Sequence, residues 1–171
     1  MTNEEILKKD SGAIFSDCRK YRYVLWRRWN SVSLFGDDPM NHIMFIGLNP
    51  STANENDDDP TIRRVIRFAK DWGYNGVYML NLFAIVSADP KVLQTPGLDL
   101  QMNNQHWIDR MYQLSADVLF AWGTFKEAKT RAKEIISMFP YAICLGKNAD
   151  GSPKHPLYIA ANTVPNKFLT P

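Results

Sequence analysis

The sequence predicts an α/β fold, a three-layer α/β/α sandwich around a central, mainly parallel four-stranded sheet. Short apolar runs alternate with segments of ten or more residues that have helical periodicity, and this alternation is typical of strands joined by right-handed crossover helices. The 171 residues are 45% hydrophobic and 22% charged, which is the balance of one globular domain. We therefore expect a single domain over residues 1–171, with residues 1–41 as an N-terminal extension that packs on the core.

Four segments are predicted to form the strands. Each is short and rich in branched and aromatic residues, as expected for parallel strands that are buried on both faces. The first is followed by Pro50, which cannot donate to a strand ladder. The predicted strands are Ile43 to Leu48, Val77 to Phe83, Asp117 to Ala121 and Tyr141 to Leu145.

Three segments between these strands are predicted to form helices. Asp59 followed by Pro60 is a strong start signal, because it combines an N-cap acceptor with a proline at the first helical position, and Gly73 ends this helix. The second helix runs from about Asn104 to Leu114 and the third from about Thr124 to Met138.

Composition excludes several classes of protein. No apolar run approaches the roughly 18 residues of a membrane span, and the polar segment Met1 to Asp10 does not resemble a secretion signal. We therefore expect a cytoplasmic protein with no membrane partner. Cys18 and Cys144 are too few for a disulfide framework and lack the spacing of zinc ligands, which predicts reduced thiols. The formal net charge of +2 permits binding to nucleic acid but does not indicate it.

Polar residues gather at the expected carboxyl ends of the strands, which is where α/β sheets bind ligands. Asn81, inside an apolar strand, could read the edge of a nucleobase or satisfy a neighbouring backbone group. Asn49 could orient a water molecule or a sugar hydroxyl, or it could serve only in the turn before Pro50. His155 is the best candidate for catalysis, because an imidazole held between prolines can donate to an anion that develops on a leaving group.

The charged segments each have two interpretations. Asp57, Asp58 and Asp59 could hold magnesium, but a helix cap and the helix dipole explain them better. The cations of the first predicted helix, which include Arg63 and Arg64, form a solvated face or meet phosphates. The basic and aromatic stretch from Arg19 to Trp29 either contacts nucleic acid or forms an edge strand.

The sequence lacks the motifs that usually identify three classes of enzyme. The sequence contains no phosphate-binding Gly-Lys-Ser/Thr loop, no dinucleotide-binding glycine fingerprint and no Gly-x-Ser-x-Gly nucleophile turn. This argues against a nucleoside triphosphatase, a dinucleotide-dependent enzyme and a serine hydrolase of the usual kinds.

The order of the motifs along the chain resembles that of the uracil-DNA glycosylase superfamily. Longer strings, such as GLNPSTA, DDPTIRR and NLFA, also resemble a bacterial and phage family catalogued as domain-of-unknown-function family 1643, which has no established activity. The motifs are Gly47-Leu48-Asn49-Pro50-Ser51, the strand Val77 to Phe83 with its asparagine, Leu119-Phe120-Ala121-Trp122-Gly123, and His155-Pro156.

The superfamily resemblance implies a role for each motif. Asn49 matches the residue that positions the hydrolytic water, Asn81 the base reader and His155 the electrophilic histidine of the last loop. The first motif has asparagine where the most active branch has aspartate, and an amide can orient water but cannot accept its proton. Ser51 replaces a tyrosine that excludes larger pyrimidines in the uracil-specific branch, so the resemblance implies a pocket that admits a larger or modified base.

The leading hypothesis is a nucleobase-recognising protein that hydrolyses an N-glycosidic bond in DNA or in a free nucleotide, without metal or another cofactor, with a role in DNA repair or modification. One alternative is a catalytically silent module that binds a nucleotide, a modified base or nucleic acid. A weaker alternative is a magnesium-dependent phosphoryl-transfer enzyme or nuclease. The predicted catalytic residues are Asn49 and His155; the substrate-binding residues are Gly47, Pro50, Ser51, Asn81, Phe83, Trp122, Gly123, Leu157 and Tyr158; the phosphate-binding residues are Arg63, Arg64 and Lys154.

Overall fold

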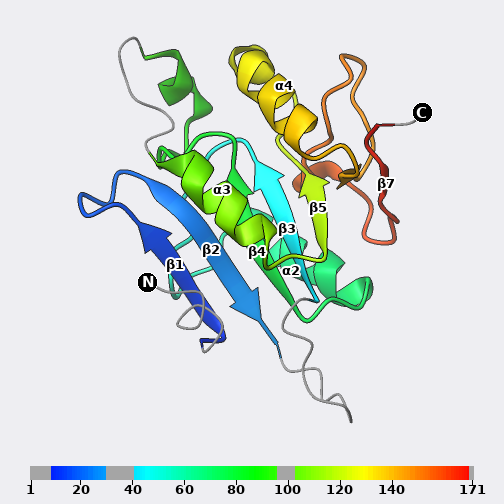
Figure 1. The fold of residues 1–171 in the computed structure, drawn as a ribbon, viewed down its shortest axis with the longest axis horizontal. Coiled ribbons are helices and arrows are strands. Elements are labelled where there is room, and N and C mark those ends of the chain that lie inside the picture. Colours follow the sequence, from blue (N-terminus) through cyan, green and yellow to red (C-terminus); the bar gives the residue numbers. More distant parts are fainter. Residues whose placement is uncertain (1–8, 30–40, 96–102, 170–171) are drawn as a thin grey trace.

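The computed structural model describes residues 9–29, 41–95 and 103–169. These residues form one sheet with helices on both sides (Figure 1). The strands are β1 (Ser11–Phe15), β2 (Arg22–Arg28), β3 (His42–Gly47), β4 (Gly76–Asn81), β5 (Asp117–Phe120), β6 (Ile143–Cys144) and β7 (Asn166–Lys167). The helices in these ranges are α2 (Pro60–Asp71), α3 (Asn104–Tyr112) and α4 (Lys129–Met138), with short 3-10 helices η1 (Pro90–Gln94), η2 (Lys126–Ala128) and η3 (Pro156–Tyr158).

The α/β class is confirmed, but the prediction of a four-stranded sheet was wrong. The four predicted strands do pair in parallel, in the order β4-β3-β5-β6. However, β2 and β1 extend the sheet beyond β4 with antiparallel pairing, and β7 pairs antiparallel with β6. The sheet of the described residues is therefore mixed and seven-stranded. Antiparallel neighbours need no crossover helix, so the alternation of strands and helices in the sequence did not reveal them.

The N-terminal strands are part of the sheet itself. In β2, Val24, Leu25 and Trp26 have no exposed surface, because β2 lies between β1 and β4. The stretch from Arg19 to Trp29 therefore contains an interior strand and not the edge strand that was one of its two interpretations. Residues 1–8 and 30–40, which belong to the same predicted extension, lie outside the described residues.

Side chains of the sheet alternate between two apolar layers. Ile43 and Phe45 of β3 pack with the buried face of α2, whereas Met44 and Ile46 pack with residues of α3 and α4. In Figure 1, α3 and α4 accordingly lie in front of the sheet and α2 lies behind it. Both faces of the central strands are thus covered, which explains why their sequences are apolar without a two-residue period.

Helix α2 begins where the sequence predicted. The Oδ1 atom of Asp59 accepts a hydrogen bond from the backbone N–H of Ile62 at 2.9 Å, and Pro60 occupies the first turn. The other helices differ slightly from the prediction, since α3 ends at Tyr112 and the first turn of the predicted third helix is the 3-10 helix η2. None of the described helices has the length and apolar character needed to cross a membrane.

The cap on α2 generates a stability prediction. Asp59→Ala is expected to lower the free energy of unfolding by about 1 kcal/mol, because the N–H of Ile62 loses its acceptor. Asp59→Asn keeps an acceptor oxygen and is the matched control, with most of the stability retained. Urea denaturation measures both variants, and a wild-type midpoint for Asp59→Ala would contradict this role.

Candidate functional site

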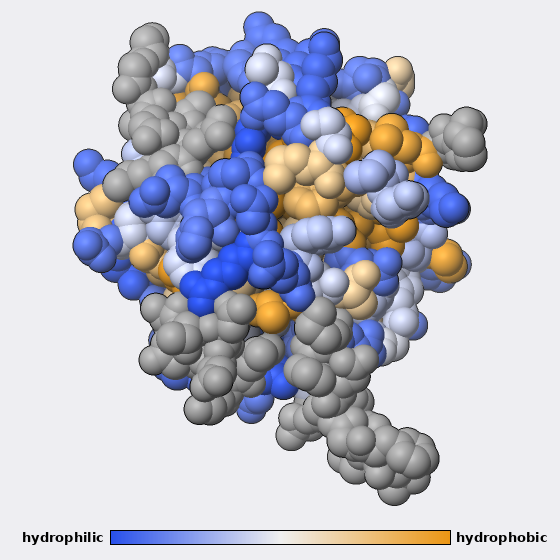
Figure 2. All heavy atoms as spheres, in the orientation of Figure 1, coloured by the Kyte–Doolittle hydropathy of each residue, from blue (hydrophilic) through white to orange (hydrophobic). Residues whose placement is uncertain are grey.

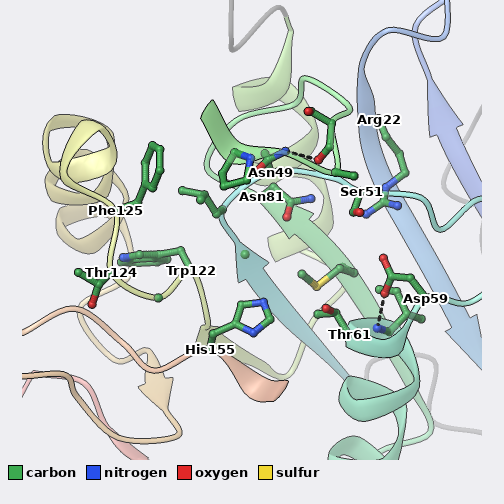
Figure 3. Close-up of a pocket in the computed structure, with 18 of the residues that line it drawn as sticks. Arg22, Asn49, Ser51, Asp59, Thr61, Asn81, Trp122, Thr124, Phe125 and His155 are labelled. Atoms are coloured by element: carbon green, nitrogen blue, oxygen red, sulfur yellow. Dashed lines mark hydrogen bonds between the residues drawn. The ribbon is translucent and has the colours of Figure 1, made fainter. Parts of the chain in front are cut away.

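A hollow of about 400 Å³ lies where the carboxyl ends of the parallel strands β3, β4 and β5 meet the loop that follows β6. Its volume is in the range of small-molecule sites, which is roughly 300–1,000 Å³. Figure 3 shows Trp122 and Phe125 on one side of the hollow and Arg22 and Asp59 on the other. The sequence-predicted residues that line it are Gly47, Asn49, Ser51, Asn81, Trp122, Gly123, His155 and Tyr158.

The amide of Asn49 is fixed by the backbone. Its Nδ2 donates to the carbonyl oxygen of Ser87 at 2.9 Å and to that of Pro50 at 3.1 Å. Both amide hydrogens are used in these bonds, so Oδ1 is the group that remains to accept a hydrogen bond. Asn49 is therefore a turn residue whose fixed amide also belongs to the lining of the hollow.

The side chain of Asn81 is buried in the floor of the hollow. It is 2% exposed, and its Nδ2 has no hydrogen-bond partner among the described residues. Gly47, its partner in the β3–β4 register, makes room for it: a Cβ atom on Gly47 would lie 2.7 Å from Oδ1 of Asn81 and 2.6 Å from the terminal methyl of Met79. Any larger residue at position 47 would displace Asn81, because these contacts are far inside van der Waals distance.

Helix α3 fixes the backbone around Asn81. The buried side chain of Asn104 donates to the carbonyl oxygens of Asn81 and Leu82, at 2.9 and 3.2 Å. The N–H of Leu82 in turn donates to the carbonyl of Gly47 at 2.9 Å. The backbone of Asn81 is thus fixed by hydrogen bonds, while Nδ2 of its side chain has no partner among the described residues, which is the arrangement expected of a ligand-binding group.

The loop that carries His155 is tied to the end of β5. The N–H of Gly123, whose φ is +73°, donates to the carbonyl of Pro153 at 3.0 Å, and the N–H of Lys154 donates to the carbonyl of Gly146 at 2.9 Å. The imidazole of His155 points into the hollow (Figure 3). Its Nδ1 accepts from the backbone N–H of Leu157 at 3.4 Å, so the proton of the neutral ring lies on Nε2.

Burial lowers the pKa of His155 from its ordinary value of 6.5, and the nearby carboxylate of Asp59 opposes this shift. The ring is therefore kept neutral more readily than a histidine in water. A neutral imidazole with its proton on Nε2 is a hydrogen-bond donor toward the hollow.

One wall of the hollow contains residues that sequence reasoning did not assign to the site. They are Arg22 at the start of β2, and Asp59 and Thr61 at the start of α2 (Figure 3). Arg22 is 2% exposed; one terminal nitrogen donates to the carbonyl of Ala53 at 2.6 Å, and its Nε has no partner among the described residues. Burial lowers the pKa of Arg22 to about 10, while Asp59 opposes this effect and Arg27 adds to it.

A sequence signal for Arg22 did exist. Like Asn81, it stands beside an apolar strand sequence, Tyr-Val-Leu-Trp, and a polar residue in such a position needs a partner if it is buried. For Asp59 the sequence favoured a helix cap over a magnesium ligand; the cap is confirmed for Oδ1, but it does not account for the place of Asp59 in the wall of the hollow.

Several predicted site residues lie elsewhere. Phe83 belongs to the core beneath α3 and α4, Pro50 is buried in its turn, and Leu157 is exposed outside the hollow. Trp122 does line the hollow, and its ring packs on Phe120 and Phe168 of the core. Phe125 and Tyr158, of which Tyr158 is 85% exposed, also supply aromatic rings to the lining of the hollow.

The predicted phosphate-binding cations do not line the hollow. Arg63 donates to the carbonyl of Asp58, and Arg64 donates to the carbonyl of Ile159 and lies over the ring of Phe68. Lys154 is exposed on the other side of its loop, beside Gly146. Among the described residues that line the hollow, Arg22 is the permanently charged cation.

The three consecutive aspartates have separate structural partners. Asp57 accepts from the side chain of Asn54 at 3.0 Å, Asp58 forms an ion pair with Arg27 at 2.8 Å, and Asp59 caps α2. Within residues 9–29, 41–95 and 103–169, no group of three histidine, cysteine, aspartate or glutamate side chains is arranged to hold a metal ion. The structure therefore explains the acidic run by ion pairing and capping.

A second hollow of about 360 Å³ lies between α4 and the C-terminal segment, on the other side of Trp122. Its lining includes Ala132, Ile136 and Phe168, and Figure 2 shows apolar surface beside the C-terminal end of the chain. None of the buried polar atoms that lack a partner in the described chain belongs to its lining. The first hollow, which has two such atoms from Arg22 and Asn81, is the better candidate for a specific site.

The depressed pKa of His155 generates a pH prediction. The folded state disfavours the protonated ring, so its contribution to stability is fully present above pH 6.5 and is lost as the pH falls through the lower folded-state value. The stability of the wild-type protein relative to His155→Gln is therefore expected to decrease when the pH drops below 6.5. Urea denaturation over this range measures the difference, with the exposed His106→Gln in α3 as a control variant. A relative stability that rises on acidification would contradict the burial of this ring.

Comparison with known proteins identifies the family but not the activity. No curated protein and no solved structure matches the chain. One family model matches, over residues 22–157, a range that begins at Arg22 and includes Asn49, Asn81 and His155. Because this match spans most of the chain, the protein belongs to the family described as "Protein of unknown function (DUF1643)".

Proposed function

We propose that this protein binds a nucleobase in the hollow at the strand ends and hydrolyses its N-glycosidic bond without a metal ion. The observation that carries the proposal is the side chain of Asn81, which is 2% exposed, rigidly framed and unpaired at Nδ2 in the floor of that hollow. The superfamily resemblance in the order of the sequence motifs supports the same conclusion.

The amide of Asn81 suits the edge of a base. It offers donors at Nδ2 and an acceptor at Oδ1, and the edges of nucleobases present complementary pairs of acceptors and donors. An unpaired buried donor costs roughly 1–3 kcal/mol, and a bound base would remove this cost. Phe125 and Tyr158 provide aromatic faces at the same hollow for stacking.

Asn49 and His155 suit the two halves of a hydrolysis. A water molecule that donates to Oδ1 of Asn49 would be oriented toward the sugar carbon C1′. Its oxygen forms a bond to C1′ as the C1′–N bond breaks, and the electron pair of that bond leaves with the base. The Nε2–H of His155 stabilises the departing anion, and the proton released by the water passes to solvent or to the base. Because Asn49 cannot accept a proton, we expect slow turnover.

One observation favours a second candidate, a binding module without catalysis. Asp59 is the carboxylate among the described residues that line the hollow, and its Oδ1 is already engaged by the helix cap. A site whose carboxylate caps a helix, and whose Asn49 cannot accept a proton, can bind a base and still fail to activate water. Binding of a base without its release would support this alternative.

The test is base release in the absence of added metal. Purified protein is incubated with chelator and with single- and double-stranded oligonucleotides that contain uracil, mismatched thymine or modified bases, and with the corresponding free nucleotides. Mass spectrometry scores released base and abasic sites. We expect release that falls at least about 100-fold in Asn49→Ala and in His155→Ala, in line with the loss of a positioning or charge-stabilising group. Asn81→Ala is expected mainly to weaken binding of the base.

Matched controls separate the site from general damage. Asn162→Ala and His106→Ala remove the same residue types at exposed positions outside the hollow, and they should leave release unchanged. Release that requires added magnesium, or that survives both Asn49→Ala and His155→Ala, would overturn the proposed mechanism.

A further inference from the structure

Arg22 is a buried cation without a full set of partners. One of its terminal nitrogens reaches the carbonyl of Ala53, its Nε is unpaired among the described residues, and the side chain faces the hollow beside Ser51 (Figure 3). A buried charge is costly unless an opposite charge or several hydrogen bonds compensate it. Asp59 in the same wall compensates the charge of Arg22 in part. The other buried arginine that lies near, Arg27, has fuller compensation, because Asp58 and the carbonyls of Trp26 and Asn54 bind it.

The surroundings of Arg22 are suited to an anion. Thr61 lies in the same wall, in the first turn of α2, and its side chain carries a hydroxyl that can donate a hydrogen bond. Ser51 adds a second hydroxyl. A guanidinium with hydroxyl donors beside it is a common chemistry of phosphate recognition.

The depth of Arg22 restricts which phosphate can reach it. The side chain is 2% exposed and accessible through the hollow, so its anion must enter with the rest of the ligand. The backbone of a DNA duplex would run across the surface, yet Arg63 and Arg64 are engaged by backbone carbonyls and neither they nor Lys154 line the hollow. The overall charge of +2 adds little general attraction for a polyanion.

We propose that Arg22, with Ser51 and Thr61, binds the phosphate of a nucleoside monophosphate, so that the substrate is a free mononucleotide and not a base within duplex DNA. This inference rests on the proposed function, because it assumes that the base of the same ligand contacts Asn81. The carboxylate of Asp59 in the same wall limits the positive charge of the site. The site therefore matches one phosphate better than the accumulated charge of a triphosphate.

The test compares the binding of nucleosides, nucleoside monophosphates and nucleoside triphosphates by calorimetry. We expect the wild-type protein to bind the monophosphate of its preferred base roughly 10- to 100-fold more tightly than the nucleoside, the effect of one or two charge-assisted hydrogen bonds. Arg22→Met should abolish this preference and leave the affinity for the nucleoside unchanged. Arg22→Met leaves the carbonyl of Ala53 without its donor, so circular dichroism and urea denaturation check that the variant is folded before its binding is compared.

Two further variants sharpen the result. Arg22→Lys keeps the charge but loses the planar fork, and it should retain part of the preference. Arg131→Met removes a buried arginine of α4 outside the hollow, where Glu134 and Gln105 bind it, and should leave the preference intact.

The outcomes distinguish the inference from the proposed function. Equal affinity of the wild-type protein for nucleoside and monophosphate, a preference that survives Arg22→Met, or base release that is faster from duplex oligonucleotides than from monophosphates would overturn the role of Arg22 and leave the nucleobase site standing. Inorganic phosphate that binds through Arg22, with no affinity for any nucleoside and no base release, would overturn the proposed function itself and with it the mononucleotide.

Discussion

The candidate site depends on the parallel register that pairs Gly47, the last residue of β3, with Asn81, the last residue of β4. This register ends both strands at the same edge of the sheet, and the missing side chain of Gly47 provides the space that the amide of Asn81 occupies. The loops that carry Asn49 and His155 are then anchored around this pair by backbone hydrogen bonds. A shift of one residue would move Asn81 to the opposite face of the sheet, because side chains alternate along a strand.

The hollow combines two buried polar groups that the chain leaves incompletely satisfied. Most buried polar atoms in folded proteins have a partner, whereas Nδ2 of Asn81 and Nε of Arg22 have none among the described residues, and both side chains face the same space. One is a neutral amide and the other is a cation. Asn81 ends β4, and Arg22 begins β2, which pairs with β4. A ligand that pairs with both would need a polar planar edge and an anionic group at once. This complementarity, and not the volume of the hollow, is the basis of the functional proposals.

Whether a residue assigned to the site from the sequence lines the hollow depends on its position relative to the strand ends. Asn49 and Asn81 line the hollow because they stand at or just after the ends of predicted parallel strands. His155 lines it because backbone hydrogen bonds tie the loop after β6 to the end of β5. Phe83 does not line the hollow, because it lies two residues beyond Asn81, where the chain has turned into the core under α3. Arg63 and Arg64 do not line the hollow. Helical periodicity shows only that their face of the helix is polar, and their partners are carbonyls in the preceding turn and in a loop about ninety residues away.

The sequence by itself determined the α/β class, the four parallel strands, the start of α2 at Asp59 and the loops that bear Asn49 and His155. These features follow from local signals, namely apolar runs, helical periods, a cap and prolines. Only the tertiary structure decided that β1, β2 and β7 complete the sheet and that Arg22 reaches the hollow. The physical reason is that antiparallel pairing and the burial of a charge depend on which segments become neighbours in space. Residues 22 and 155 line the same hollow because the order of the strands in the sheet differs from the order of the strands in the chain.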